Sequence, residues 1–95
     1  MAGVLGFSNA LRYRGRIPTE SGGDFNDIDH GIWEAYAVGS FLNTPTDYKY
    51  GTLVCIKTGI FTVQVSFPLN NNDRIHYRVK DGTNQWYPWR SVQYI

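Results

Sequence analysis

The sequence predicts an all-β fold: a small single domain of about six antiparallel strands, arranged as a sandwich or a meander, after a short N-terminal connector. Three observations predict it. Apolar and polar residues alternate in several short runs, which is the pattern of half-buried strands. Clusters of Gly, Pro, Asn and Asp separate these runs. Aromatic residues make up 16% of the chain and charged residues only 18%, a composition that suits pleated surfaces better than helices.

The N-terminal half is expected to contain a connector and two strands. Residues 1–20 are assigned to the connector, which is also a candidate trimerisation segment, and residues 21–95 to the β-domain. Within the connector, "ALRYRGRI" alternates between apolar residues and arginines, with Gly15 at a bulge. "PTESGGDFNDID" is a surface loop, and "HGIWEAYAVG" is the next strand.

The C-terminal half is expected to contain a central hairpin and a closing strand pair. "TLVCIKT" and "FTVQVSF" flank Gly59 and predict a hairpin over residues 52–67. After a turn in "PLNNND", the run "RIHYRVK" alternates again. We expect its apolar residues to point inward and its polar residues to point outward: Ile75, Tyr77 and Val79 against Arg74, His76, Arg78 and Lys80. "PWRSVQYI" is the closing strand.

The net charge and the single cysteine limit the partners and the compartment. A net charge of +1 gives no field that would attract nucleic acid or an anionic membrane. One cysteine excludes an internal disulfide framework, and its place in an apolar run predicts a buried thiol at Cys55. The sequence shows neither the ~20 apolar residues of a membrane span nor the pattern of a signal peptide. We therefore expect a soluble protein made in a reducing cytoplasm, without nucleic-acid binding or membrane insertion.

The sequence offers little that would support catalysis or a metal site. His30 and His76 lie apart, and a single cysteine does not allow a zinc site of the Cys/His type. Asp24, Asp27 and Asp29 resemble part of a calcium loop, but the bidentate glutamate and the loop glycine of that motif are missing. These carboxylates are better explained as hydrogen-bond partners for backbone groups of a turn. We expect no enzyme activity, no cofactor and no bound metal.

The aromatic segment Trp86-Tyr87-Pro88-Trp89-Arg90 raises the question of whether its rings form a platform for a ligand or the corner of the core. Pro88 has no N–H group, so the last strand begins at or after it. Tryptophans at such a corner commonly bury their rings while the indole N–H finds a carbonyl. We therefore expect Trp86 and Trp89 to be buried and Tyr87 to be exposed.

The same segment carries a resemblance to a known family. "DRIHYRVKDGTNQWYPWRSV" resembles the C-terminal signature of pyocin-knob domains, which are small β-domains of bacteriophage tail fibres and R-type pyocin fibres. The matching positions are Tyr77-Arg78, Asp81-Gly82, Trp86 to Arg90, and Val92. Upstream, "DFNDIDHGIWEAYAVG" and "NTPTDYKYGTLVCI" resemble the opening segment and the Asn-x-Pro loop of the family, so the resemblance covers residues 24–95.

The resemblance implies a non-enzymatic virion component. The expected function is that of a knob domain in a bacteriophage tail fibre or tailocin fibre, with a structural role and a role in host-surface recognition. Such a chain would be made in the host bacterial cytoplasm and located in the tail fibre of the virion. The implied partners are two further copies in a homotrimer, other fibre or baseplate proteins, and a glycan of the host cell surface.

The candidate glycan site lies around the 81–87 turn. Tyr87 and Trp86 would stack on a sugar ring, and His76 and Arg78, pointing outward from the neighbouring strand, would donate hydrogen bonds to hydroxyls or to an acidic group. These residues would meet because residues 74–80 and 88–94 are expected to pair across the turn.

Two other classes of function stay open. A carbohydrate-binding module of a larger bacterial protein would use the same Trp and Tyr side chains. An oligonucleotide-binding barrel would use the basic residues that share one parity in "RYRGRI" and "RIHYRVK". The net charge of +1, and the aromatic residues on the opposite parity, favour the barrel least.

Overall fold

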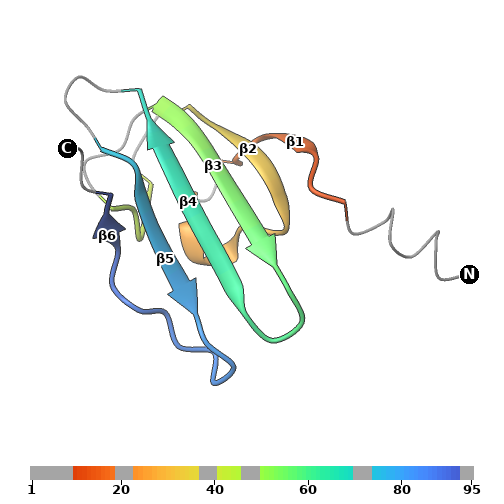
Figure 1. The fold of residues 1–95 in the computed structure, drawn as a ribbon. Coiled ribbons are helices and arrows are strands. Elements are labelled where there is room, and N and C mark those ends of the chain that lie inside the picture. Colours follow the sequence, from red (N-terminus) through yellow and green to blue (C-terminus); the bar gives the residue numbers. More distant parts are fainter. Residues whose placement is uncertain (1–9, 19–22, 37–40, 46–49, 70–73, 93–95) are drawn as a thin grey trace, which may run out of the picture.

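The computed structural model describes residues 10–18, 23–36, 41–45, 50–69 and 74–92, and it contains one six-stranded mixed sheet. The strands lie side by side in chain order, from β1 at one edge to β6 at the other (Figure 1). Their bounds are β1 Tyr13–Arg16, β2 Gly31–Tyr36, β3 Tyr50–Lys57, β4 Thr62–Pro68, β5 His76–Lys80 and β6 Arg90–Ser91. The all-β fold class is confirmed. Residues 1–9 of the connector and the turn at 70–73 lie outside the described residues.

Strands β2 to β6 form an antiparallel meander, and the expected hairpin stands at its centre, where Thr52 pairs with Phe67. The prediction of antiparallel pairing throughout is wrong for β1, which pairs with β2 in parallel. A parallel pair requires a crossover connection. The segment between β1 and β2, which includes the short 3-10 helix η1 (Phe25–Asp27), provides this crossover and passes over one face of the sheet. A register shift between Tyr13 and Gly15 confirms the bulge.

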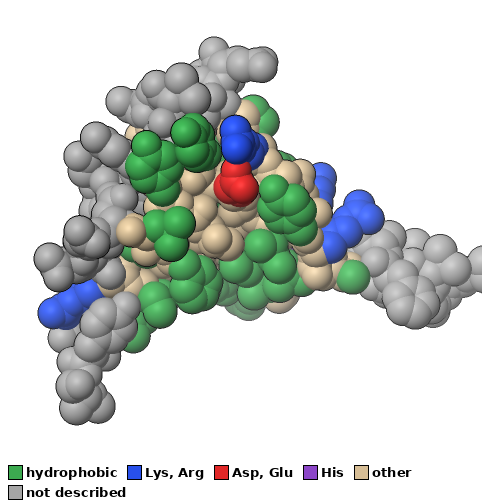
Figure 2. Space-filling view, turned by 90° about the horizontal axis from the view of Figure 1, so that it is seen from above, with side chains coloured by type: hydrophobic (Ala, Val, Ile, Leu, Met, Phe, Trp, Pro, Cys, Tyr) green, Lys and Arg blue, Asp and Glu red, His purple; other side chains and the backbone are tan. Residues whose placement is uncertain are grey.

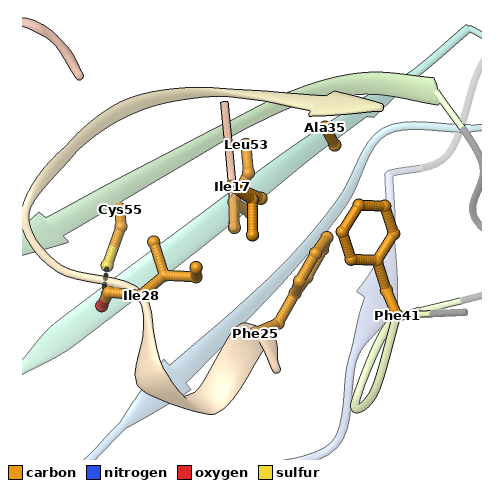
Figure 3. Close-up of a cluster of buried hydrophobic side chains, with 7 residues drawn as sticks. All are labelled: Ile17, Phe25, Ile28, Ala35, Phe41, Leu53 and Cys55. Atoms are coloured by element: carbon orange, nitrogen blue, oxygen red, sulfur yellow. Dashed lines mark hydrogen bonds between the residues drawn. The ribbon is translucent and has the colours of Figure 1, made fainter. Parts of the chain in front are cut away.

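The hydrophobic core lies between this crossover segment and one face of the sheet, which we call the covered face. Figure 3 shows Phe25 and Ile28 of the crossover, together with Phe41, opposite side chains from the central strands. The buried core residues are Ile17, Phe25, Ile28, Ala35, Phe41, Leu53 and Cys55. Phe25 and Phe41 pack with their ring centroids 5.4 Å apart. The Cys55 thiol is buried as expected, and it donates to the Ile28 carbonyl oxygen at 3.5 Å.

Strands β4 and β5 turn their polar residues toward the covered face. The buried polar side chains of the described residues are Thr62, Gln64, Ser66 and Arg78. The prediction that Arg78 points outward and Tyr77 inward is wrong, because Arg78 is 5% exposed and Tyr77 is 37% exposed. The residues of β5 do alternate between two sides, as predicted. The side expected to face solvent faces the core, and the side expected to face the core faces solvent. The crossover segment offers the Phe25 carbonyl oxygen to Gln64, and Trp86 and Trp89, which precede β6, offer their indole rings to Arg78.

The opposite side of the sheet, which we call the open face, carries two cross-strand rows of apolar residues. Strand register places Ile32, Val54, Val65 and Tyr77 in one row and Ile56, Val63 and Val79 in the other. None of these seven residues is buried, and none belongs to the core cluster. Among the described residues, the segments that pack on the sheet thus cover only one of its faces.

The core assignment predicts different effects for two leucines. Leu53 has no exposed surface, so Leu53→Ala is expected to lower the free energy of unfolding by about 2–5 kcal/mol, through lost contacts and an unfilled cavity. Leu42 is 53% exposed, so Leu42→Ala is the matched control and should change it by only about 0.5 kcal/mol or less. Urea denaturation followed by circular dichroism measures both, and equal losses would contradict the placement of the core.

Candidate functional site

The carboxylate of Asp81 organises the 81–87 turn. One of its oxygens accepts hydrogen bonds from the Thr83 amide at 2.9 Å, the Thr83 hydroxyl at 2.6 Å and the Gln85 amide at 3.3 Å. The other accepts from the Tyr87 hydroxyl at 3.0 Å. Asn84 adopts a left-handed conformation with φ of 65°, which asparagine tolerates better than most residues. The turn is therefore held in one shape by a single side chain.

Tyr87 is 51% exposed and stands beside a small groove, as expected for a residue that contacts a ligand. The groove has a volume of about 150 Å³ and runs between β5 and the segment that leads to β6. Its lining residues are Tyr77, Arg78, Val79, Tyr87, Pro88 and Arg90. The Tyr87 amide donates to the Val79 carbonyl oxygen at 2.9 Å, which fixes the backbone at the base of the ring.

Of the other three predicted site residues, only Arg78 lines the Tyr87 groove, and its side chain is buried. Register places His76 and Arg78 on the covered face, and Trp86 joins them there through its contact with Arg78. Trp86 is half-buried and forms an isolated bridge with Lys80. The structure therefore brings Trp86 and Arg78 together on the covered face. Arg78 also lines the Tyr87 groove, whereas Trp86 and His76 do not.

Arg78 is a structural side chain. Its guanidinium carbon lies 3.8 Å from the ring centroid of Trp86 and 4.6 Å from that of Trp89, and its Nε donates to Gln64 Oε1 at 2.9 Å. Desolvation lowers the pKa of Arg78 to about 10, with Asp24 opposing the shift, so the group stays charged at neutral pH. Cation–π contacts with two indole rings stabilise this charge, to which no carboxylate of the described residues is bonded.

Trp89 is half-buried rather than fully buried, and it packs against the core as a corner residue. Its ring meets Phe25 edge-on with centroids 6.4 Å apart, and its indole N–H donates to the Asn43 carbonyl oxygen at 3.0 Å. The residues of the aromatic segment thus have two different roles. Trp86 and Trp89 support the covered face, and Tyr87 is directed to solvent.

Three buried polar atoms in this region have no hydrogen-bond partner among the described residues: Ser66 Oγ, His76 Nδ1 and Arg78 Nη2. Ser66 and His76 are cross-strand neighbours, and Arg78 follows two positions along β5. His76 is half-buried, so its ring has limited access to solvent.

The sequence reasoning missed two residues of the groove, Tyr77 and Arg90. Tyr77 was assigned to the interior, yet register pairs it with Arg90 on the open side of the sheet. The same alternation along β5 would have identified them if its polar residues had been assigned to the core side and its apolar residues to the outer side. The predicted pairing across the turn is itself confirmed by the antiparallel contact of β5 with β6.

A second groove of about 440 Å³ lies at the end of the sheet where β2 ends and β3 begins. Tyr36 and Tyr50 pack there with ring centroids 5.1 Å apart. The Arg16 guanidinium, which is paired with Glu34, lies 4.6 Å from the Tyr36 centroid. Figure 2 shows this end of the molecule, with hydrophobic side chains gathered around a basic and an acidic side chain. A cation therefore already occupies a face of the Tyr36 ring.

The acidic loop forms contacts within the protein, as expected for two of its three aspartates. Asp24 accepts from the Asn26 amide at 2.9 Å and the Asn43 side chain at 2.8 Å. Asp29 accepts from the His30 amide and forms an ion pair with Lys57, and these contacts lower its pKa, the backbone bond most strongly. Within the described ranges, no group of three or more His, Cys, Asp and Glu side chains is arranged to hold a metal ion.

Comparisons with known proteins assign no family to this chain. No protein-family model, no curated protein and no solved structure matches it. The described residues also include no helix of the length and hydrophobicity needed to cross a membrane. Function must therefore be inferred from the residues of this chain and their contacts.

The hydrogen bonds to Asp81 predict an acid-sensitive turn. They lower the pKa of Asp81 below its ordinary 3.8, with the Thr83 hydroxyl as the largest cause. A lowered carboxyl pKa means that the stabilisation is complete above 3.8 and is lost as the pH falls through the folded-state value. An NMR titration of the Asp81 carboxyl carbon should give a midpoint below 3.8, and Tyr87→Phe should move it upward. A midpoint at or above 3.8 in the wild type would contradict the geometry of the turn.

Proposed function

We propose that this chain is a non-enzymatic domain of a bacteriophage tail fibre or tailocin fibre, and that it recognises a host surface glycan through the Tyr87 groove. The observation that carries the proposal is the exposed Tyr87 ring, held in place by Asp81 beside Pro88 and Arg90. An aromatic ring next to a guanidinium suits a sugar, because the ring stacks on its C–H face while the guanidinium donates to hydroxyl or carboxylate oxygens.

The Tyr87 groove is a better candidate than the groove at Tyr36. Arg16 lies over the Tyr36 ring, and Glu34 holds Arg16 in position. No ring or cation among the described residues stacks on Tyr87. Its hydroxyl is hydrogen-bonded to Asp81, and the faces of its ring have no such partner among those residues. A sugar can therefore contact the Tyr87 ring without displacing an existing partner.

The fibre assignment is supported by the resemblance of residues 24–95 to pyocin-knob domains. Its most specific part, the Trp-x-Pro-Trp-Arg element, has a physical role in this fold. Its two tryptophans enclose Arg78, and Pro88 and Arg90 line the groove beside Tyr87. The same glycan chemistry would serve a carbohydrate-binding module. An oligonucleotide-binding barrel is favoured less, because Arg78 is buried and the sheet has β1 and β6 at opposite edges.

Glycan recognition is tested with an array of purified bacterial lipopolysaccharides and capsular polysaccharides. A single stacked ring with a few hydrogen bonds gives affinity on the order of millimolar, so the chain should be displayed in three copies to gain avidity. We expect binding to at least one polysaccharide, and a loss of about tenfold or more in affinity per site for Tyr87→Ala and Arg90→Ala, which corresponds to about 1.4 kcal/mol.

Tyr36→Ala is the matched control, since it removes an exposed tyrosine of the other groove and should leave binding unchanged. Arg78→Ala is unsuitable because Arg78 supports the fold. Wild-type binding that survives both groove substitutions, with circular dichroism unchanged, would place the glycan elsewhere. A wild type that binds none of the polysaccharides would argue against recognition and leave only a structural role in the fibre.

A further inference from the structure

The open face has the polarity of a buried surface. In a sheet with one solvated side, apolar residues normally point to the core and polar residues to water. Strands β4 and β5 do the reverse. Their polar residues are on the covered face, where Gln64 bonds to the Phe25 carbonyl oxygen and Arg78 bonds to Gln64, and Val63, Val65 and Val79 are on the open face. One apolar row crosses the four strands β2 to β5, and the other crosses the three strands β3 to β5. Contiguous apolar patches of this kind commonly mark interaction sites.

We propose that the open face is the contact surface between copies of this chain. The inference follows from the polarity of the sheet and does not depend on the fibre assignment or on glycan binding. The surface is occupied by further copies of the same chain, and the seven residues of the two rows are the centre of the contact.

The charges of the open face favour an apolar partner. Neither row contains a charged residue. At one end of the face, Arg16 and Glu34 already pair with each other. At the β6 edge, Arg90 pairs with Tyr77 in register. A nucleic acid or a strongly charged peptide would find no complementary charges at the centre, whereas the same flat apolar face of another copy matches it.

The size of the open face also suits self-association. Strands about 4.8 Å apart, with a rise of about 3.4 Å per residue, give the four central strands a flat area of about 400 Å². Side-chain relief and the flanking tyrosines raise the accessible area toward the roughly 800 Å² per partner of a standard interface. The face is therefore large enough for a stable contact.

Simple geometry allows three copies to meet around an axis. Four strands at about 4.8 Å span about 19 Å. Three faces of that width, arranged as a triangle, lie about 5.5 Å from the axis, close to half of the ~10 Å that separates packed sheets. Valine and isoleucine side chains then fill the axis without a channel, so we expect a mass near three times the 10.9 kDa of the chain.

The test compares Val65→Lys with Ile60→Lys in sedimentation equilibrium. Val65 lies in the middle of the face, whereas Ile60 is 70% exposed in the β3–β4 turn and provides the matched control. At about 500 µM chain, above the micromolar dissociation constant expected for this area, wild type and Ile60→Lys should be oligomeric and Val65→Lys should be monomeric. A monomeric wild type, or an oligomer that Val65→Lys leaves intact, would overturn the proposal.

Thiol labelling keeps the test decisive if Val65→Lys does not fold. Val65→Cys should react with a maleimide more slowly as the chain concentration rises, whereas Ile60→Cys should react at a constant rate, and the native Cys55 is buried. Equal, concentration-independent rates for both variants would overturn the proposal. Protection of Val65→Cys at every concentration would also overturn it, because a segment of the same chain would then cover the face.

Discussion

Gln64 has no exposed surface, and its side-chain amide bonds to partners on both sides. Its Nε2 donates to the Phe25 carbonyl oxygen at 2.7 Å, and its Oε1 accepts from Arg78 Nε at 2.9 Å. The first bond fastens the covering segment to the middle of the sheet, and the second fixes the guanidinium that the two tryptophans enclose. A buried amide without partners is costly, so these bonds determine which side of β4 faces the core.

The arrangement of the candidate sites follows from that choice. Because Gln64 and Arg78 face the core, the alternate residues Val65 and Tyr77 face outward. Trp86 and Trp89 are required on the covered face as partners of Arg78. Tyr87, between them, is left on the other side, where Asp81 anchors its hydroxyl. One polar contact thus separates the supporting rings from the ring that is available to a ligand.

Strand positions were predictable from the sequence because the alternation of residues is a local property. The central hairpin, the Gly15 bulge, the buried Cys55 and the exposed Tyr87 all follow from short-range patterns, and the structure agrees with each. The parallel pairing of β1 was not predictable in this way. It depends on a crossover whose path is set by contacts between distant residues.

The orientation of β4 and β5 was predicted wrongly for a similar reason. Alternation identifies two sides of a strand, but it does not say which side another segment will cover. Gln64 bonds to Phe25, 39 positions away in the sequence, and the residue pattern of β4 does not predict that contact. Hydrophobicity alone assigned Val79 to the interior and Arg78 to solvent. The groove residues Tyr77 and Arg90 were missed as a consequence.

The most direct test of this account is to compare Gln64→Val with Val65→Gln by urea denaturation, at a concentration where the wild type is monomeric. Gln64→Val should lower the free energy of unfolding by about 1–3 kcal/mol for each buried group left without its partner. Val65→Gln, on the open face, should change it by about 1 kcal/mol or less. The opposite order, with Gln64→Val tolerated and Val65→Gln strongly destabilising, would show that the apolar side of β4 faces the core and would contradict the account.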